Sequence, residues 1–133
     1  GKGGALVKVS SGKATAVWQN RSMKSHFSSP LLAKGYLFGN DDGTLRCLDF
    51  KTGAVKWSKG GLGKGGLMAA DGKLIVLSEH GLLSIAQATA AGYKELATAQ
   101  VLGGTCWTAP VLSGGRIYCR NQEGDLVCLN VKS

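Results

Sequence analysis

Proline, acidic residues and long apolar runs are all scarce in this sequence. Only 2 of its 133 residues are proline, and 8 are Asp or Glu. No apolar run approaches the roughly 20 residues that a membrane-spanning helix needs, so no membrane span is expected. No signal peptide is visible, since no apolar core follows the opening Gly-Lys-Gly-Gly. With 44% hydrophobic and 18% charged residues, the composition is that of a folded globular chain.

The scarcity of acidic residues leaves the chain basic. It has 16 Lys and Arg residues and a formal net charge of +8. A basic chain suits nucleic acid, an anionic membrane surface or an acidic ligand. Here the basic residues are scattered, with no run of even three. A dedicated nucleic-acid role is therefore not expected, while a basic surface that binds an anionic partner stays open as an alternative.

The motifs of common catalytic and metal sites are also missing. His26 and His80 have no serine or cysteine nucleophile motif beside them, so no catalytic residue is predicted. Residues 61–66 match the spacing of a dinucleotide-binding glycine motif, but no helix pattern follows them, so a loop between blades is expected. The acidic cluster at residues 40–43 lacks the further ligands of a calcium loop and is expected to be a hairpin turn.

Cysteine is limited to four residues, and none of them forms a Cys-x-x-Cys pair. A zinc site is therefore not predicted. Cys119 and Cys128 flank a predicted hairpin with a four-residue loop, which would place them directly opposite each other and allow a cross-strand disulfide. In the alternative interpretation, Cys47 and Cys128 fill one small apolar slot in successive copies of a repeat. Cys106 has no predicted role, and the disulfide state of all four residues stays open.

Glycine, in contrast, is abundant, with 21 residues at short intervals. When the sequence is shifted by 80 residues, Pro30 falls on Pro110 and Gly35 falls on Gly115. A middle copy places Gly72 at the position of Gly35. The period is therefore about 40 residues in roughly three copies, which indicates an array of like supersecondary units.

Each unit is predicted to contain four antiparallel strands. In the first copy, four short apolar runs are separated by turns such as Asp42–Gly43 and Thr52–Gly53, which are hairpin signals. Neither face of these strands is consistently polar, so both faces are expected to be covered. This pattern predicts an all-β fold of four-stranded β-propeller blades. Residues 82–100 have the composition of a helix, but the repeat places Gly92 at a turn, so strands are predicted there as well.

The whole chain, 1–133, is predicted to be one repeat segment. It divides into the end of a blade (1–20), two full blades (26–59 and 64–100) and an incomplete blade (105–133), with thirteen strands in all. Three blades cannot close a ring, because propellers use about 4–8 blades. We expect either an arc of a longer chain or a head-to-tail homo-oligomer, in which the strand at 14–18 of one copy completes the third repeat of another.

The stretch from residue 43 to 57, GTLRCLDFKTGAVKW, carries a family resemblance. Leu48, Asp49, Thr52, Gly53 and Trp57 match the repeat of the pyrroloquinoline-quinone-repeat (PQQ-like) β-propellers, of the quinoprotein alcohol dehydrogenase-like type. The resemblance implies a blade-docking role for these residues, with the tryptophan packed between neighbouring blades. It also implies a periplasmic or extracytoplasmic location.

Two further positions occupy the place of this tryptophan in the other copies. Trp18 lies 39 residues before Trp57 and is expected to share its docking role. Leu96 lies 39 residues after Trp57, so the junction that follows the middle copy is expected to be more weakly held.

The resemblance also brings in a possible enzyme. Quinone-dependent dehydrogenases of this type place a disulfide of adjacent cysteines against the cofactor and bind calcium through acidic and amide ligands. This sequence has no adjacent cysteines. No cofactor is therefore predicted, and the leading hypothesis is a non-catalytic scaffold or a protein- or ligand-binding surface. A fragment of a quinone-dependent dehydrogenase, with PQQ and calcium, stays open as the alternative.

The first strand of each blade lies nearest the propeller axis in this family. Phe27, Lys64 and Trp107 occupy equivalent positions at the start of these strands, so they are candidates for one mouth of a central channel. Two aromatic rings and an ammonium group would suit an anionic or planar ligand. Plain packing at the strand starts is the alternative.

Overall fold

The computed structural model describes residues 4–10, 12–20 and 30–130. These residues form thirteen β-strands and no helix, so no helix among them could cross a membrane. The strands are β1 (Gly4–Ser10), β2 (Lys13–Asn20), β3 (Leu31–Ala33), β4 (Tyr36–Asp41), β5 (Gly43–Asp49), β6 (Val55–Gly63), β7 (Gly66–Ala70), β8 (Lys73–Leu77), β9 (Leu82–Gln87), β10 (Glu95–Gln100), β11 (Val111–Ser113), β12 (Arg116–Arg120) and β13 (Leu126–Asn130).

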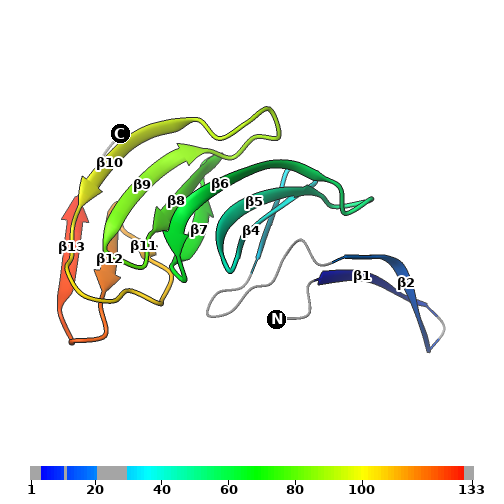
Figure 1. The fold of residues 1–133 in the computed structure, drawn as a ribbon, viewed down its shortest axis with the longest axis horizontal. Helices are drawn as coiled ribbons and strands as arrows, with labels where there is room; N and C mark the ends of the chain where they lie inside the picture. The colour runs from blue at the N-terminus through cyan, green and yellow to red at the C-terminus, as the bar shows by residue number, and fades with distance from the viewer. Residues whose placement is uncertain (1–3, 11, 21–29, 131–133) are drawn as a thin grey trace.

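The strands form four antiparallel sheets in which chain neighbours pair with each other. We call them the N-terminal half-blade (β1–β2), the first blade (β3–β6), the second blade (β7–β10) and the third blade (β11–β13). Figure 1 shows the half-blade at one end of the row and the third blade at the other, with no closure between them. The predicted fold class, an all-β partial propeller with four-stranded blades, is confirmed.

Tight turns with positive φ angles explain why the strands reverse where they do. Three hairpins turn at Lys34–Gly35, Asp42–Gly43 and Asp71–Gly72, and in each pair both residues have positive φ, for example 51° and 72° in the last pair. This is the turn whose twist matches that of the flanking strands, and Asp-Gly adopts it readily. The predicted hairpin at residues 40–43 is therefore present.

The segment with helix-like composition also forms strands. Residues 82–87 and 95–100 are β9 and β10, and Gly92, with φ of 143°, lies between them. The tertiary environment outweighs the helix propensity of Ala and Leu here, because the apolar side chains of β9 are buried between two blades.

The core consists of two apolar layers between neighbouring blades. Along β8, Leu74 and Val76 face the first blade, whereas Ile75 and Leu77 face the third, as strand alternation requires. Burial of each such side chain stabilises the fold by about 1.5–3 kcal/mol. The first layer contains Phe38, Leu45, Cys47, Leu62, Leu67, Leu74, Val76 and Ala88, and the second contains Ile75, Leu77, Leu83, Cys106, Ile117 and Cys119.

The strand order gives each blade two different ends. The turn between its second and third strands lies at the same end as the links to neighbouring blades, because successive strands run antiparallel. We call this end the connection face. The hairpins between the first and second strands and between the third and fourth lie at the opposite end, the hairpin face.

Candidate functional site at the inter-blade connections

Glu79 is the centre of a polar cluster on the connection face. Its Oε1 accepts a hydrogen bond from the Trp107 indole Nε1–H at 2.6 Å, and its Oε2 accepts one from the Lys64 backbone N–H at 3.3 Å. Two of the predicted channel-mouth residues, 43 positions apart in the sequence, are thus brought to one carboxylate. The third, Phe27, lies outside the described residues, as does His26.

The hydrogen bonds also set the charge state of Glu79. The Trp107 indole holds the pKa of the Glu79 carboxyl below its ordinary value, with a smaller contribution from the Lys64 backbone N–H, while partial burial opposes both. Glu79 is therefore ionised at neutral pH. The backbone of Glu79 adds two links, because its N–H donates to the Leu62 carbonyl and its carbonyl accepts from the Cys106 N–H. Glu79 therefore bonds to both connections of the second blade, the one that precedes it and the one that follows it.

Two glycines make this close approach possible. A Cβ atom on Gly63 would lie 2.2 Å from the Glu79 carboxylate, and one on Gly65 would lie 2.0 Å from the Leu77 carbonyl oxygen. Gly63 also has a positive φ of 61°. The glycine run at residues 61–66 therefore ends β6, crosses between blades and begins β7, as predicted for a loop between blades.

Two buried asparagines hold the same connections, and the sequence analysis did not identify them. The Asn40 side-chain amide donates to the carbonyls of Gly63 and Gly65 at 2.7 and 3.1 Å, and its Oδ1 accepts from the Gly43 N–H. The Asn121 amide donates to the Gly103 carbonyl at 3.1 Å. Both are 5% exposed. Their position at or just after the end of the second strand of a blade, where the chain turns, was the available signal.

The hairpin face contains the predicted docking tryptophans. The Trp57 indole Nε1–H donates to the Thr89 carbonyl of the second blade at 2.7 Å, and the Trp18 indole donates to the Phe50 carbonyl of the first blade, also at 2.7 Å. Each tryptophan and its acceptor are 32 residues apart. The two bonds are therefore the same contact in successive repeats.

Aromatic packing accompanies the bond of Trp57. Its ring lies 6.0 Å from that of Phe38 and 5.7 Å from that of Tyr93, the latter in an edge-on arrangement. Leu96, which holds the same repeat position in the second blade, lies in a β-bulge and is 45% exposed. The indole that links the second blade to the third is instead that of Trp107, on the connection face.

Asp49, Thr52 and Gly53 shape the turn before Trp57. The Asp49 carboxylate accepts from the backbone N–H groups of Lys51 and Thr52 at 2.8 and 3.1 Å, and the Asp49 carbonyl accepts from the Gly53 N–H. The bond from the Thr52 backbone is the main reason why the pKa of Asp49 lies below its ordinary value. These residues fix the path of the chain into β6 and so orient Trp57.

The predicted opposition of Cys119 and Cys128 is wrong. The register of β12 and β13 pairs Cys119 with Val127 and Tyr118 with Cys128. The loop runs from Asn121 to Asp125, one residue longer than the expected four, and this shift turns the two thiols to opposite faces of the sheet. A disulfide between them within one sheet is therefore excluded.

The four thiols differ in accessibility. All are free, and only Cys128 is exposed. Burial raises the pKa of Cys47 and of Cys119 to about 11, and it also raises the pKa of Cys106. The buried thiols are therefore protonated at neutral pH and shielded from reagents.

The polar groups of the connection face serve as links between blades. Among residues 4–10, 12–20 and 30–130, no group of three or more His, Cys, Asp or Glu is placed to hold a metal. The cluster around Glu79 pairs one carboxylate with two N–H donors, which differs from the oxygen-rich ligand set that calcium requires. His80 is exposed, and its carbonyl accepts from the Gln100 side chain at 2.7 Å.

Comparison with known proteins agrees with the predicted family resemblance. Residues 1–59 match the family model described as outer membrane protein assembly factor BamB. No curated protein matches the chain. Among solved structures, BamB from Moraxella catarrhalis matches with a TM-score of 0.75 and 18% identity, over 97% of this chain and 41% of that one.

Two other structures have the same fold at lower identity. The computationally designed Ika8 protein matches with a TM-score of 0.69 and 12% identity, over 88% of this chain and 37% of that one. Quinohemoprotein alcohol dehydrogenase ADHIIG from Pseudomonas putida HK5 matches with a TM-score of 0.66 and 15% identity, over 80% and 19%. The chain thus spans less than half the length of each of these structures.

Proposed function

Because the chain has the fold of the PQQ-repeat β-propellers and matches the BamB family model over residues 1–59, we propose that it acts as a non-catalytic, protein-binding scaffold. The proposal rests on one observation, which is that the residues of the candidate site bond to one another. The Glu79 carboxylate accepts hydrogen bonds from the Lys64 backbone N–H and the Trp107 indole. These bonds link three successive stretches of the chain. Such a site stabilises a binding surface.

The outermost strands offer the surface that a protein partner would use. Every residue of β10 is exposed, and β10 is the last strand of its sheet in the order β10-β9-β8-β7. An exposed edge presents backbone N–H and C=O groups that an extended protein segment can pair with. The proposed partner is therefore an extended β-strand of another protein, in keeping with a family described as an assembly factor.

A fluorescence-anisotropy titration with a labelled, alternating Val/Thr peptide of about ten residues tests this proposal. We expect saturable binding that weakens at least about tenfold when Ala97 and Ala99 are both changed to Lys, since a charged edge resists strand addition. Gln122→Lys, which adds one lysine at an exposed turn of the third blade, is the control and should leave binding unchanged. Absence of binding, or equal loss in both proteins, would refute the proposed edge.

A quinone-dependent dehydrogenase is the competing function, suggested by the fold shared with ADHIIG. The test is reduction of an electron-accepting dye by the purified chain with added PQQ, calcium and an alcohol. We expect no saturable turnover. Dye reduction that requires both PQQ and calcium would replace the scaffold proposal with the enzymatic one.

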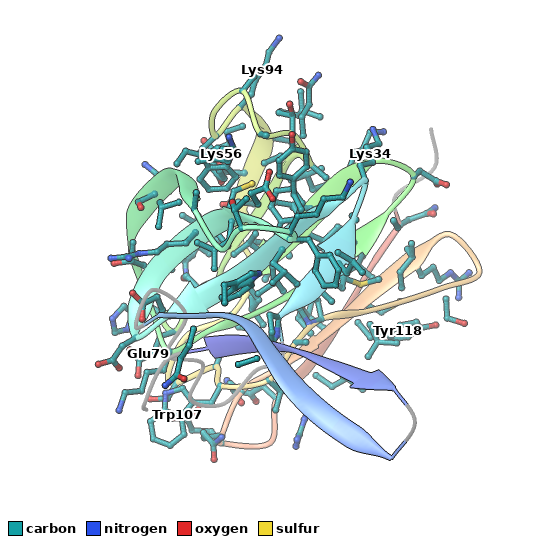
Figure 2. All side chains as sticks on the ribbon, turned by 90° about the vertical axis from the view of Figure 1, so that its right-hand side faces the viewer. Lys34, Lys56, Glu79, Lys94, Trp107 and Tyr118 are labelled. Carbon is teal, nitrogen blue, oxygen red and sulfur yellow. The ribbon has the colours of Figure 1, made fainter. Side chains whose placement is uncertain are left out.

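An anionic partner is a second candidate, favoured by the charges of the hairpin face. In Figure 2, Lys34, Lys56 and Lys94 lie at the end opposite to Glu79 and Trp107. A salt-dependent retention on a polyanion column that is lost in Lys34→Glu and Lys94→Glu would support it. In the three blades, the turns of the hairpin face and the strand residues next to them hold Lys34, Asp49, Lys51, Asp71, Lys73, Lys94, Glu95 and Arg116, whereas those of the connection face hold Asp41, Asp42, Lys64, Glu79, Arg120, Glu123 and Asp125.

The family also suggests where the protein works. Its PQQ-repeat fold supports a periplasmic or extracytoplasmic location as part of the same proposal. Fractionation of cells that express the full-length gene product, with detection by an antibody against residues 30–130, tests this location.

A further inference from the structure

A lysine of the first blade reaches the outer part of the second blade. Strands β6 and β10 are the last strands of their sheets, and Figure 1 shows both along the outer side of the row of blades. The Lys59 ammonium of β6 lies 5.7 Å from the centre of the Tyr93 ring of the second blade, within the range of a cation–π contact. The Tyr93 ring in turn packs edge-on against Trp57 at 5.7 Å. The positive charge of Lys59 is therefore held against the neighbouring blade.

Strand alternation decides which side of β10 faces this charge. Leu83 of β9 is buried toward the third blade, so the next residue, Ser84, points toward the first blade. Ser84 pairs with Thr98 of β10, and cross-strand partners share one face of the sheet. Thr98 therefore points toward the first blade as well. A strand added to β10 follows the same alternation, so every second side chain of that strand would point to the side on which Lys59 lies.

Lys59 lies beside the regular part of β10. It pairs with Leu45 of β5, whereas Ala99 of β10 pairs with Leu83 of β9. Leu45 and Leu83 each stand two residues after the positive-φ glycine at the turn into the third strand of their blade. Lys59 and Ala99 thus occupy equivalent positions of neighbouring outermost strands.

The charges around this part of β10 favour an acidic partner. The described residues form one salt bridge, between β4 and β5, and Lys59 takes no part in it. Glu95, the one charged residue of β10, lies at its first position, and its Oε1 accepts a hydrogen bond from the Tyr93 hydroxyl at 3.2 Å. An acidic side chain on an added strand would therefore meet a cation beside residues 97–100, and a basic one would be repelled.

The edge of β6 is a poorer acceptor than that of β10. The pairing of β6 with β5 shifts register twice, and Lys56 and Lys59 are both exposed along it. Bulges and lysines are features that keep edge strands from pairing with other chains. Strand β10 shifts register once, near Glu95, and pairs regularly from Ala97 to Gln100. Lys59 is therefore better placed to select a strand bound to β10 than to bind one on its own edge.

We propose that the strand received by β10 is acidic, with Asp or Glu at alternate positions on the side that faces the first blade, where Lys59 pairs with them. This inference rests on the proposed strand addition and specifies the chemistry of the partner. The Tyr93 ring already positions the Lys59 ammonium, so less side-chain ordering is needed when a carboxylate binds. An exposed ion pair of this kind changes affinity by up to about fivefold.

Three labelled peptides of about ten residues test this specificity by fluorescence anisotropy. They are alternating Val/Thr, alternating Val/Glu, and a peptide of the Val/Glu composition with its glutamates in one block. At about 0.15 M salt, where the Debye length is about 8 Å, attraction to the net charge of the chain is largely screened. We expect alternating Val/Glu to bind about fivefold more tightly than Val/Thr, and the block peptide to bind no more tightly than Val/Thr.

Matched variants locate the preference at Lys59. Lys59→Gln should abolish it, whereas Arg120→Gln, which removes an exposed charge on the connection face, should keep it. Lys59→Glu should reverse it, so that an alternating Val/Lys peptide binds more tightly than Val/Glu. Equal affinity for Val/Thr and Val/Glu refutes the acidic specificity and leaves strand addition standing, whereas failure of every peptide to bind refutes both. Equal loss of the preference in Lys59→Gln and Arg120→Gln, or tighter binding of the block peptide, also refutes the proposal.

Discussion

Replacement of Trp57 by alanine should reveal how strongly neighbouring blades depend on one side chain. The change removes the hydrogen bond to Thr89, worth about 1 kcal/mol, and two aromatic contacts worth about 0.5–1.5 kcal/mol each, to Phe38 and Tyr93. It also exposes apolar surface of the core layer. Because Trp57 is half-buried, the total should lie near the lower end of the usual range for Trp→Ala, at about 3 kcal/mol.

Urea unfolding followed by fluorescence measures this loss. With an m-value of about 2 kcal/mol/M, the midpoint should fall by about 1.5 M. Trp57→Phe keeps a ring between Phe38 and Tyr93 and removes the N–H donor, so it should cost about 1 kcal/mol. Leu96→Ala is the control, since it alters the same repeat position at an exposed side chain and should cost less than about 0.5 kcal/mol. A loss below about 1 kcal/mol for Trp57→Ala would refute inter-blade docking.

Three further predictions concern the connections and the thiols. Asn40→Ala should destabilise the chain by about 2–4 kcal/mol in urea melts, because three hydrogen bonds disappear from a buried site. The lowered pKa of Glu79 stabilises the fold above the ordinary carboxyl pKa, and this advantage over Glu79→Gln should disappear in melts as the pH falls from 7 to 3. In thiol titrations of the native chain, Cys47, Cys106 and Cys119 should stay unreactive at every protein concentration, and a second fast thiol would contradict their burial.

The local pattern of the sequence was enough to identify the blades. Asp-Gly turns, apolar runs and the repeat period specify where hairpins reverse and how many strands a unit has, because these are properties of short segments. The same period correctly outweighed the helix propensity of residues 82–100. The equivalence of Trp18 and Trp57 was also recognisable from the sequence. Both indoles donate to a carbonyl of the following blade that lies 32 residues further along the chain.

What the sequence did not reveal depends on distances between segments. The sequence assigned no role to Glu79, yet Glu79 joins Lys64 to Trp107, because blade stacking brings two connections to one carboxylate. Asn40 lies in the predicted hairpin turn at residues 40–43, and Asn121 had no predicted role. The role of both follows from carbonyls that approach from another part of the chain.

The sequence by itself determined the repeat, the strand order within each blade and the equivalence of Trp18 and Trp57. The tertiary structure alone decided which side of each strand is covered. One extra loop residue before β13 turned Cys128 away from Cys119, because each one-residue shift of register moves a side chain to the opposite face. Stacking of the second blade on the first buries Cys47, whereas Cys128, at the equivalent position of the third blade, is exposed. Burial in a propeller depends on which blade follows, and that information lies outside the segment itself.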